Sequence, residues 1–406
     1  MKILIVSQYF YPENFRINDF AFSLCSRGHE VTVLTGLPNY PKGKLFGDFK
    51  VLKTQRVNGI KIIRVPLLPR FSSKGWQLFL NYLSFLLSSL IFAPFLLRSK
   101  NFDVVFTPNY SPATVGITGV FLSKWKNTKM VLWIQDFWPE SLKATGAINS
   151  EYILKIVGSM VRWIYQRSDL ILLQSKAFKK PLLKLNIPED KLIYFPNWAE
   201  DLYSKTDLEG NPLLNEIMPK DKFIVMFAGN LGKAQSLDTI LKAADITKDS
   251  KVHWVILGDG RDRRRFEEGV SKLQLNNISL LGSYPVEQMP SFFNYADVLI
   301  VTLKSDPIFA ATIPGKIQSY MLSGKPIIAS LDGEGAKVID ESGCGISVQA
   351  EDFEGLANSV IKMSIKSKKE RTIMGQKAKE FYYDNFDREM LVDKFEKMIK
   401  TKIKSI

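Results

Sequence analysis

MKILIVSQYFYPENFRINDFAFSLCSRGHEVTVLTG, residues 1–36, is the stretch that decides the fold. It opens with the apolar run Lys2–Val6, which is typical of a strand, and continues into a helical pattern. That pattern stops at Gly28, because glycine is favoured in the left-handed position that ends many helices. A second apolar run, Val31–Leu34, follows at once. The first 36 residues therefore predict a strand–helix–strand unit.

The same alternation continues along the chain. Further strands are predicted in the first half at Ile60–Val65, Val104–Phe106, Met130–Ile134 and Leu170–Leu173. In the second half they are predicted at Phe223–Ala228, Val252–Leu257, Ile278–Leu281, Val298–Thr302 and Pro326–Ala329. Runs this uniformly apolar suit parallel strands that are covered on both faces. The sequence therefore predicts the α/β class with doubly wound, Rossmann-like parallel sheets, whose ligands bind beyond the strand carboxyl ends.

Length and composition fit a globular protein of two domains. The 406 residues suit two cores of about 200 residues each, and 46% apolar with 24% charged residues is ordinary for a folded chain. A polar stretch that begins at Pro196 is a candidate hinge. We predict an N-terminal domain at residues 1–196, a linker at 197–221, a C-terminal domain at 222–375 and a helical segment at 376–406, with the domains facing a central cleft.

The charge of the chain points to an anionic partner. The formal charge of +14 comes from 55 Lys and Arg against 41 Asp and Glu. Nucleic acid, phospholipid headgroups and a phosphorylated substrate would each fit, and a solvated basic surface is the alternative. Cys25 and Cys344 lie far apart without metal-ligand spacing, and the N-terminus lacks the apolar stretch of a signal peptide. A reduced, intracellular protein is the simplest interpretation.

One stretch, residues 76–97, carries no charge over 22 residues, which is enough to span a bilayer at about 20 residues. Pro94 interrupts it. Its polar residues recur at helical spacing and so share one face: Gln77, Asn81, Ser84 and Ser88. Basic residues flank it and could meet anionic headgroups: Arg70, Lys74, Arg98 and Lys100. We favour a helix in the membrane plane over a buried core helix or a true span.

Two motifs in the first half lie where predicted strands end. A helix that starts near Asn14 would direct its free backbone amides at the cleft, which suits an anion, and Arg16 could add a bidentate contact. Asp136 follows another strand, and its neighbours Phe137 and Trp138 could exclude water and raise its pKa. Ordinary helix capping and a helix start at Pro139 are the structural alternatives.

Four motifs in the second half could hold a nucleotide. The glycines of Gly229-Asn230-Leu231-Gly232-Lys233 follow a strand and let the backbone approach a phosphate. Gly258-Asp259-Gly260-Arg261 ends the next strand and could frame a base. Lys316 lies at a helix start that suits a diphosphate, and Glu334 could accept both hydroxyls of a ribose. Turns also need glycines like the pair after the first of these strands, and the Glu334 motif alone would equally serve as a turn.

Together these segments resemble the family 4 glycosyltransferases of the GT-B fold, and most closely the bacterial enzymes described as N-acetyl-L-fucosamine (L-fucosamine) transferases. The resemblance covers nearly the whole chain. Its most specific parts are Tyr9–Asp19, Arg27–Thr35, Asp136–Ser141, Gly229–Gln235, Gly258–Gly260, Lys316–Pro326 and Glu334–Ile339. It implies a donor site in the C-terminal domain, an acceptor site in the N-terminal domain, and a last helix, Gln376–Lys404, that crosses back to the first domain.

The resemblance also implies a reaction and its residues. A sugar such as N-acetyl-L-fucosamine would move from a UDP-sugar to a polyprenyl-diphosphate-linked saccharide in O-antigen synthesis, by a peripheral protein at the cytoplasmic face of the bacterial inner membrane. No metal, cofactor or nucleic-acid partner is predicted. Asp136 and Glu13 would be catalytic. Asn14, Arg16 and Gln135 would bind the acceptor or its phosphate. The donor would be bound by Gly229, Asn230, Lys233, Gly258, Asp259, Gly260, Arg261, Lys316 and Glu334.

The chain departs from the family pattern at four positions. Two glutamates that usually precede the Gly-Lys-Pro signature are replaced by Ala311 and Ser319. Asn230 stands where arginine is common, and Gln135 stands where histidine is common. Retention of the anomeric configuration is therefore only weakly implied. If Asp136 deprotonates the acceptor for in-line displacement, the configuration would invert.

Three alternatives to a transferase stay open at this point. A nucleotide-sugar 2-epimerase has a similar fold, although it would need no membrane helix. A non-catalytic basic protein that binds nucleic acid or lipid would explain the charge, although the sequence holds no recognised nucleic-acid module. A catalytically silent sugar-nucleotide-binding scaffold would explain the two missing glutamates.

Overall fold

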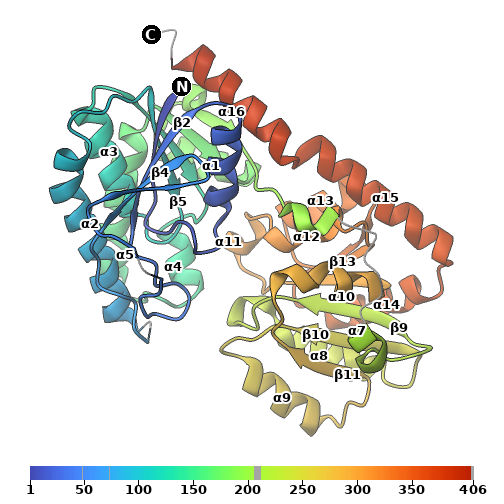
Figure 1. Ribbon diagram of the computed structural model, residues 1–406. Coiled ribbons are helices and arrows are strands. Elements are labelled where there is room, and N and C mark those ends of the chain that lie inside the picture. The colour runs from blue at the N-terminus through green and yellow to red at the C-terminus, as the bar shows by residue number, and fades with distance from the viewer. Residues whose placement is uncertain (48, 73, 205–211, 404–406) are drawn as a thin grey trace. The chain divides into compact units, whose positions relative to one another are not determined.

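The computed structural model describes residues 1–47, 49–72, 74–204 and 212–403, which form two compact units (Figure 1). The first unit comprises Met1–Pro196 and Arg388–Ile406, and the second comprises Asn197–Asp387. Each unit holds one mostly or wholly parallel sheet with helices packed on it. The predicted α/β class with two Rossmann-like domains is confirmed.

The sheet of the first unit has the strand order β3-β4-β2-β1-β5-β6-β7-β8 in the described part of the chain. The strands are β1 (Lys2–Val6), β2 (Glu30–Gly36), β3 (Thr54–Val57), β4 (Ile60–Val65), β5 (Val104–Asn109), β6 (Lys129–Ile134), β7 (Leu170–Leu173) and β8 (Leu192–Tyr194). Neighbours pair in parallel except β3, which is antiparallel to β4. The edge strands β3 and β8 escape prediction because β3 is polar and β8 is only three residues long. β1 has β2 on one side and β5 on the other, so the order of the strands along the chain reverses at β1. Ligands are expected at this switch point.

The helices of the first unit pack on this sheet. They are α1 (Arg16–Ser26), α2 (Gly75–Leu96), α3 (Val115–Trp125), α4 (Glu140–Ala144), α5 (Glu151–Arg167), α6 (Lys179–Lys184) and α16 (Arg388–Lys402). Helix α3 contacts α2 on one side and α5 on the other, and α1 contacts α16 (Figure 1). The covered strands are accordingly buried along most of their length.

The segment around Gly28 anchors the last helix of the chain. Arg27 forms ion pairs with Glu389 at 2.7 Å and with Asp393, and His29 Nε2 lies 2.7 Å from Glu396. These contacts hold α16 against the first unit.

The single last helix predicted at 376–406 is wrong. The structure has two helices, α15 (Lys368–Asn385) and α16, with the break at Phe386 and Asp387. Phe386 is buried in the core of the second unit and has the non-helical φ of −128°, so packing of its ring ends α15. Helix α15 belongs to the second unit and α16 to the first. Residues 404–406 lie outside the described part of the chain.

Helix α2 packs against the rest of the first unit through a narrow face that carries both polar and apolar residues. Its buried residues recur every four positions: Asn81, Phe85, Ser89 and Ala93. The Asn81 side chain accepts a hydrogen bond from Gln8 Nε2 at 2.7 Å and donates one to the Leu68 carbonyl at 2.5 Å. Its polar side therefore packs on protein, as the spacing of its polar residues predicts.

The opposite face of α2 is apolar and exposed. Trp76 is 61% exposed, Phe79 63% and Phe95 78%, so the interpretation as a buried core helix is wrong. Within the described residues, α2 is the one helix long and apolar enough to cross a membrane by length and composition. Its buried side is part of the core that covers β2 and β4.

The sheet of the second unit is wholly parallel in the described residues, with the order β11-β10-β9-β12-β13-β14. Its strands are β9 (Phe223–Ala228), β10 (Val252–Leu257), β11 (Ile278–Gly282), β12 (Val298–Thr302), β13 (Ile327–Ser330) and β14 (Gly345–Val348). Its helices are α7 (Pro212–Ile217), α8 (Leu237–Ile246), α9 (Arg263–Lys272), α10 (Met289–Tyr295), α11 (Pro307–Ala310), α12 (Gly315–Leu322), α13 (Glu334–Ser342), α14 (Phe353–Ser364) and α15. The order reverses beside β9, which makes the end of β9 the expected ligand position.

The predicted linker at 197–221 lies with the second unit. Ala199, Tyr203, Leu214 and Met218 are buried in its core, and the Ala199 amide donates to the Tyr382 hydroxyl at 3.1 Å. Single, widely spaced apolar residues thus pack this polar stretch onto the core of the second unit. The mean hydropathy of the stretch conceals them. Residues 205–211 of the predicted linker lie outside the described residues.

Replacing Asn81 with leucine should destabilise the first unit. The change leaves the buried Gln8 amide without its acceptor, so the free energy of unfolding should fall by about 2 kcal/mol or more. Urea denaturation followed by circular dichroism measures the change. The reverse exchange on the outer face of the helix, Leu87→Asn, is the matched control and should alter stability by less than about 0.5 kcal/mol. Equal stability of Asn81→Leu and the native chain would show that this polar contact does not hold α2.

Candidate functional site

Three loops meet at the switch point of the first unit, because β1, β5 and β6 all end there. Their residues surround Tyr110, whose ring centroid lies 5.6 Å from that of Phe15. The Tyr110 hydroxyl is close enough to Arg16 and Asp136 for both charges to act on its pKa. The structure thus brings together Arg16 and Asp136, which are 120 positions apart in the sequence.

Asp136 is a partly buried carboxylate held by a short hydrogen-bond relay. Ser111 Oγ donates to Asp136 Oδ2 at 2.7 Å, and Trp138 Nε1 donates to Ser111 Oγ at 3.1 Å. Burial raises the pKa of Asp136 above its ordinary value, and the hydrogen bond from Ser111 opposes the rise. A carboxylate with a raised pKa accepts a proton more readily at neutral pH, which suits a general base.

Arg16 and Gln135 offer donors without acceptors. Arg16 is the first residue of α1, and its Nη1 atom is buried with no hydrogen-bond partner in the described part of the chain. The Nε2 atom of the buried Gln135 is in the same state. Buried donors are normally paired, so a ligand with phosphate or hydroxyl oxygens would complete them. Asn14 lies exposed two residues before α1.

Glu13 is buried and already fully used. Its carboxylate accepts hydrogen bonds from the backbone amides of Phe10 at 3.3 Å, Asn39 at 2.8 Å and Tyr40 at 2.7 Å. Burial raises its pKa, and these three bonds counteract the rise. Glu13 therefore fixes the loop after β2 against the loop after β1. Its catalytic role stays a prediction.

Sequence reasoning missed Ser111, Tyr110 and Tyr40. Ser111 follows β5, but the predicted strand Val104–Phe106 ends three residues before the observed one. The signal that could have identified Ser111 is its position just after a parallel strand, where ligand-binding loops lie. Tyr40 packs on Phe15 with ring centroids 5.1 Å apart, and no motif marks it.

A pocket of about 240 Å³ lies at the carboxyl ends of β9, β10 and β11 in the second unit. Four residues that line it were predicted: Gly229, Asn230, Gly258 and Asp259. Leu257, the last residue of β10, directly precedes the Gly258 motif. The other three were not predicted, because they follow β11 without a motif: Ser283, Tyr284 and Met289. The site therefore depends on a third loop that the sequence does not mark.

Close backbone packing explains the glycines of this pocket. A Cβ atom at Gly258 would lie 1.8 Å from the Gly229 carbonyl oxygen, and Gly258 has a φ of +128°. A Cβ at Gly229 would lie 2.5 Å from Lys316 Cε, and one at Gly260 would lie 2.3 Å from the Leu231 carbonyl oxygen. Any side chain at these positions would separate the two loops from each other or from Lys316.

Lys316 is the cation beside this pocket, because its side chain packs against Gly229. Its Nζ atom lies 3.8 Å from the centre of the Phe227 ring and donates to Gln235 Oε1. Tyr320, one turn later on α12, bonds the amide and the carbonyl of Ala228 at 3.0 and 3.1 Å and so fastens the helix to the end of β9. Burial lowers the pKa of Lys316 to about 7. A bound diphosphate would supply the missing counter-charge.

The remaining predicted donor residues lie farther from the pocket lining. Lys233 and Arg261 are exposed. Glu334 begins α13 and pairs with Lys337 at 3.0 Å. Ser319, where the family has a glutamate, donates its hydroxyl to the Gly315 carbonyl at 3.3 Å and so serves its own helix.

The lowered pKa of Lys316 predicts a pH-dependent affinity for UDP. Lys316 is cationic below about pH 7 and neutral above it, so the affinity should fall by about tenfold or more between pH 7 and pH 9. UDP keeps its full charge over this range, because the second ionisation of a phosphate group has a pKa of about 6. Isothermal titration calorimetry measures the trend. Lys316→Gln should bind weakly and without this slope, whereas the exposed-residue control Lys233→Gln should keep it.

Two family matches cover most of the chain. The family described as "Glycosyl transferase 4-like domain" matches residues 14–198, and the family described as "Glycosyl transferases group 1" matches residues 215–381. The first match falls in the first unit except for residues 197–198, and the second match falls wholly within the second unit.

Relatives and solved structures agree with these matches. The chain is 23% identical over 412 residues to an Escherichia coli protein named as the colanic acid biosynthesis glycosyl transferase WcaI, covering 97% of this chain and 98% of that one. It is 26% identical over 268 residues to the glycosyltransferase named WbjE of Pseudomonas aeruginosa, covering 65% and 66%. Anabaena HepE in complex with UDP and glucose shares the fold with a TM-score of 0.72 at 15% identity, over 99% and 100% of the two chains. An E. coli structure bound with UDP-2-fluoro glucose shares the fold with a TM-score of 0.74 at 14% identity, over 99% of each chain. The chain therefore belongs to the group 1 and 4-like glycosyltransferases and is an enzyme of the GT-B fold.

Proposed function

We propose that this enzyme moves an N-acetylamino sugar, such as N-acetyl-L-fucosamine, from a UDP-sugar to a saccharide carried on polyprenyl diphosphate. The reaction would serve a bacterial surface polysaccharide such as an O-antigen, at the cytoplasmic face of the inner membrane. The observation that carries the proposal is Lys316, a half-buried cation without a carboxylate partner in the described chain, beside the glycine loops of the second unit. The name of the relative WcaI, a transferase of colanic acid biosynthesis, supports the polysaccharide assignment.

The donor side of the reaction would use the pocket of the second unit. Tyr284 and Met289 offer apolar surface for a base, and Gly229 and Gly258 leave their backbone open to a phosphate. Lys316 and the amides at the start of α12 would stabilise the diphosphate as negative charge develops on it. Two solved structures of this fold are complexes with UDP or a UDP-sugar, which supports a UDP-linked donor.

The acceptor side would use the switch point of the first unit. Asp136 would take the proton of the acceptor hydroxyl while that oxygen bonds to the anomeric carbon of the donor. The bond between that carbon and the UDP oxygen would break, and UDP would leave with its electron pair. Arg16, with its unpaired buried Nη1, would hold an anionic or hydroxyl group of the acceptor. An in-line reaction of this kind inverts the anomeric centre.

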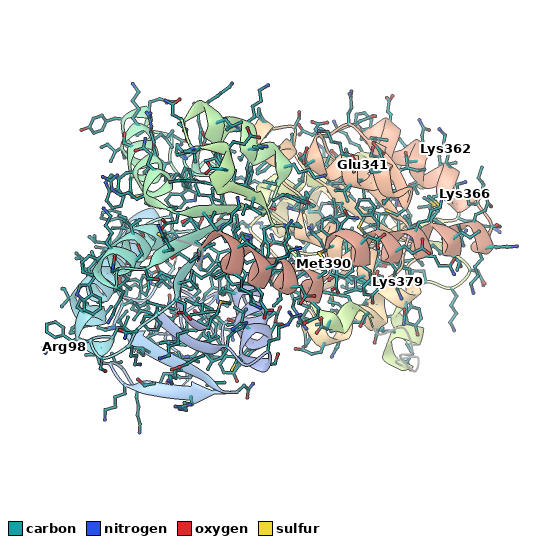
Figure 2. All side chains as sticks on the ribbon, turned by 90° about the horizontal axis from the view of Figure 1, so that it is seen from above. Arg98, Glu341, Lys362, Lys366, Lys379 and Met390 are labelled. Atoms are coloured by element: carbon teal, nitrogen blue, oxygen red, sulfur yellow. The ribbon has the colours of Figure 1, made fainter. Side chains whose placement is uncertain are left out.

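The first unit has an apolar outer surface that would rest on the membrane. On α2 it includes Trp76, Phe79, Leu87, Ile91 and Phe95, and on the neighbouring α3 it includes Phe121 and Trp125. Lys74 and Arg98 lie at the two ends of α2, and Arg98 extends away from the unit (Figure 2). Neither α2 nor α3 contains an acidic residue. An exposed apolar surface with basic ends suits peripheral binding to anionic lipid in the plane of the membrane.

Replacing Asp136 with asparagine should abolish most turnover without affecting donor binding. Loss of a general base lowers the rate by about a hundredfold to ten-thousandfold. The assay is UDP release from a panel of UDP-N-acetylamino sugars in the presence of a bacterial lipid-linked saccharide fraction, with UDP affinity measured separately. Asp249→Asn, an exposed aspartate of the second unit, is the control and should behave like the native enzyme. Native turnover in Asp136→Asn would remove Asp136 from the mechanism.

Replacing Phe79 and Phe95 together with serine should release the enzyme from membranes. Burial of each side chain in lipid contributes about 1.5–3 kcal/mol, so vesicle affinity should fall by about tenfold or more. Flotation with vesicles that contain anionic lipid measures the effect. Ile365→Ser with Tyr383→Ser, which removes two exposed apolar side chains from the second unit, should float like the native chain. A native protein that stays at the bottom of the gradient would contradict the membrane proposal.

A further inference from the structure

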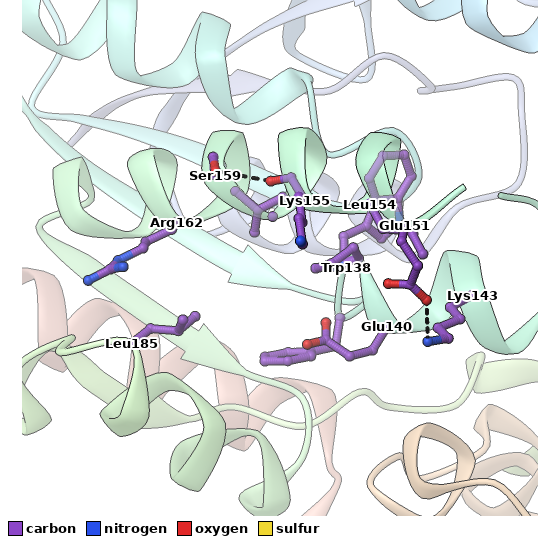
Figure 3. A pocket seen from close by; sticks show the side chains of 13 residues that line it. Trp138, Glu140, Lys143, Glu151, Leu154, Lys155, Ser159, Arg162 and Leu185 are labelled. Atoms are coloured by element: carbon purple, nitrogen blue, oxygen red, sulfur yellow. Dashed lines mark hydrogen bonds and ion pairs between the residues drawn. The ribbon is translucent and has the colours of Figure 1, made fainter. Parts of the chain in front are cut away.

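A larger pocket lies elsewhere in the first unit, between α4, α5 and the end of α6 (Figure 3). Its volume is about 600 Å³, which lies within the range of about 300–1,000 Å³ typical of small-molecule sites. Apart from Phe137, Trp138, Pro139 and Glu140, it is formed by segments that carry no motif, and the donor and acceptor sites described above do not include it. Its occupant has to be inferred from its chemistry.

The charges of this pocket are separated along its length. Lys155 and Arg162 are seven positions apart on α5 and therefore share a face, and neither side chain has a hydrogen bond or ion pair within the described residues. At the other end Lys143 pairs with Glu151 at 2.7 Å. Figure 3 shows Arg162 beside Leu185 at one end and this ion pair at the opposite end, with Lys155 between them. The face of α5 that lines the pocket thus offers two cations without an ion pair in the described residues, Arg162 at one end and Lys155 in the middle, which suits a phosphate or diphosphate.

The middle of the pocket suits a sugar. Trp138 lines it with an indole that is only 7% exposed, and the Glu140 side chain lies beside it (Figure 3). An aromatic ring can pack against the C–H face of a sugar ring, and a carboxylate can accept its hydroxyl groups. Leu154 and Val161 are buried behind this surface. The pocket therefore combines an apolar surface, a carboxylate and two cations in one row.

Trp138 also connects the pocket to the candidate base. Its Nε1 atom donates to Ser111 Oγ at 3.1 Å, and Ser111 Oγ donates to Asp136 Oδ2 at 2.7 Å. A ligand that packs on the indole therefore lies next to the relay that orients Asp136. An acceptor bound here would help to hold the residue that deprotonates it.

We propose that this pocket binds the phosphate-bearing sugar of the acceptor, with the phosphate or diphosphate on Lys155 and Arg162 and the sugar on Trp138. The inference rests on the proposed function, because it assigns to that reaction the part of the acceptor nearest its diphosphate. The same chemistry would fit a water-soluble sugar phosphate, so the test has to separate the two sources.

Gly158 provides a way to fill the pocket without disturbing the fold. It lies on α5 between the two cations and lines the pocket, and a Cβ atom there would meet only Pro139, at 3.6 Å or more. Alanine is therefore accommodated at ordinary van der Waals distance. Leucine would extend beyond Pro139 into the space that the ligand needs.

The experiment is calorimetric titration of the full-length enzyme, saturated with UDP so that the donor site is occupied. The probes are farnesyl diphosphate, glucose 1-phosphate and inorganic pyrophosphate. Lys155→Gln with Arg162→Gln should weaken binding by about tenfold or more, because each lost charge-assisted hydrogen bond is worth about that factor. Gly158→Leu should weaken it similarly. Gly158→Ala should bind like the native enzyme, as should Lys272→Gln with Lys369→Gln, which removes the same charge from exposed sites of the second unit.

The probes identify the source of the ligand. Tightest binding of farnesyl diphosphate supports a lipid-linked acceptor, and tightest binding of glucose 1-phosphate supports a soluble sugar phosphate. The proposal is overturned if the native enzyme binds none of the probes, or if the affinities are the same in the pocket variants. Titration with UDP alone separates this result from the proposed function. All variants should bind UDP normally, and failure of the native enzyme to bind UDP would count against the donor site and not against this pocket.

Discussion

The reversal of strand order beside β1 and again beside β9 is the constraint on which both sites depend. Parallel strands end at the same edge, and the reversal leaves a crevice there that no crossover helix fills. In the first unit this edge collects the loops after β1, β5 and β6, which carry Arg16, Ser111 and Asp136. In the second it collects the loops after β9, β10 and β11, which form the nucleotide-sized pocket. Residues far apart in sequence become neighbours for this single reason.

Incompletely paired polar groups lie at both of these edges. Arg16 keeps a buried nitrogen without an acceptor, and Lys316 is half-buried over an aromatic ring with only a neutral amide as partner. Burial disfavours the charged form of Lys316 in the unliganded protein, as its lowered pKa shows. A phosphate would supply a counter-charge to Lys316 and an acceptor to Arg16. Glu13 is the contrast, because three backbone amides satisfy it and it serves the fold.

Much of the fold could be predicted because buried parallel strands are apolar over their full length. The strands predicted with the bounds that the structure has are β1, β4, β7, β9, β10 and β12. Of the edge strands, β11 was predicted, whereas β3 was missed because it is polar and β8 and β14 were missed because they are short. The linker and the last helix failed for another reason: Tyr203, Met218 and Phe386 contribute single side chains to a core that local sequence does not reveal. The sequence leaves the packing of the uncharged helix α2 open. In the structure Asn81 fastens its polar face to the first unit by hydrogen bonds with Gln8 and Leu68.

The α/β class, the two sheets, the glycine loops and the position of Asp136 after a strand follow from the sequence alone, because each depends on periodicity or on residues next to one another in the chain. Which groups meet depends on tertiary packing. It joined Ser111 and Trp138 to Asp136, gave Glu13 its backbone partners, and added Ser283, Tyr284 and Met289 to the pocket. It also placed the Trp138 indole, from the loop before α4, against the cations of α5 in one pocket. Such contacts depend on how strands are ordered in the sheet, and strand order is set by packing across the whole unit and not by any local pattern.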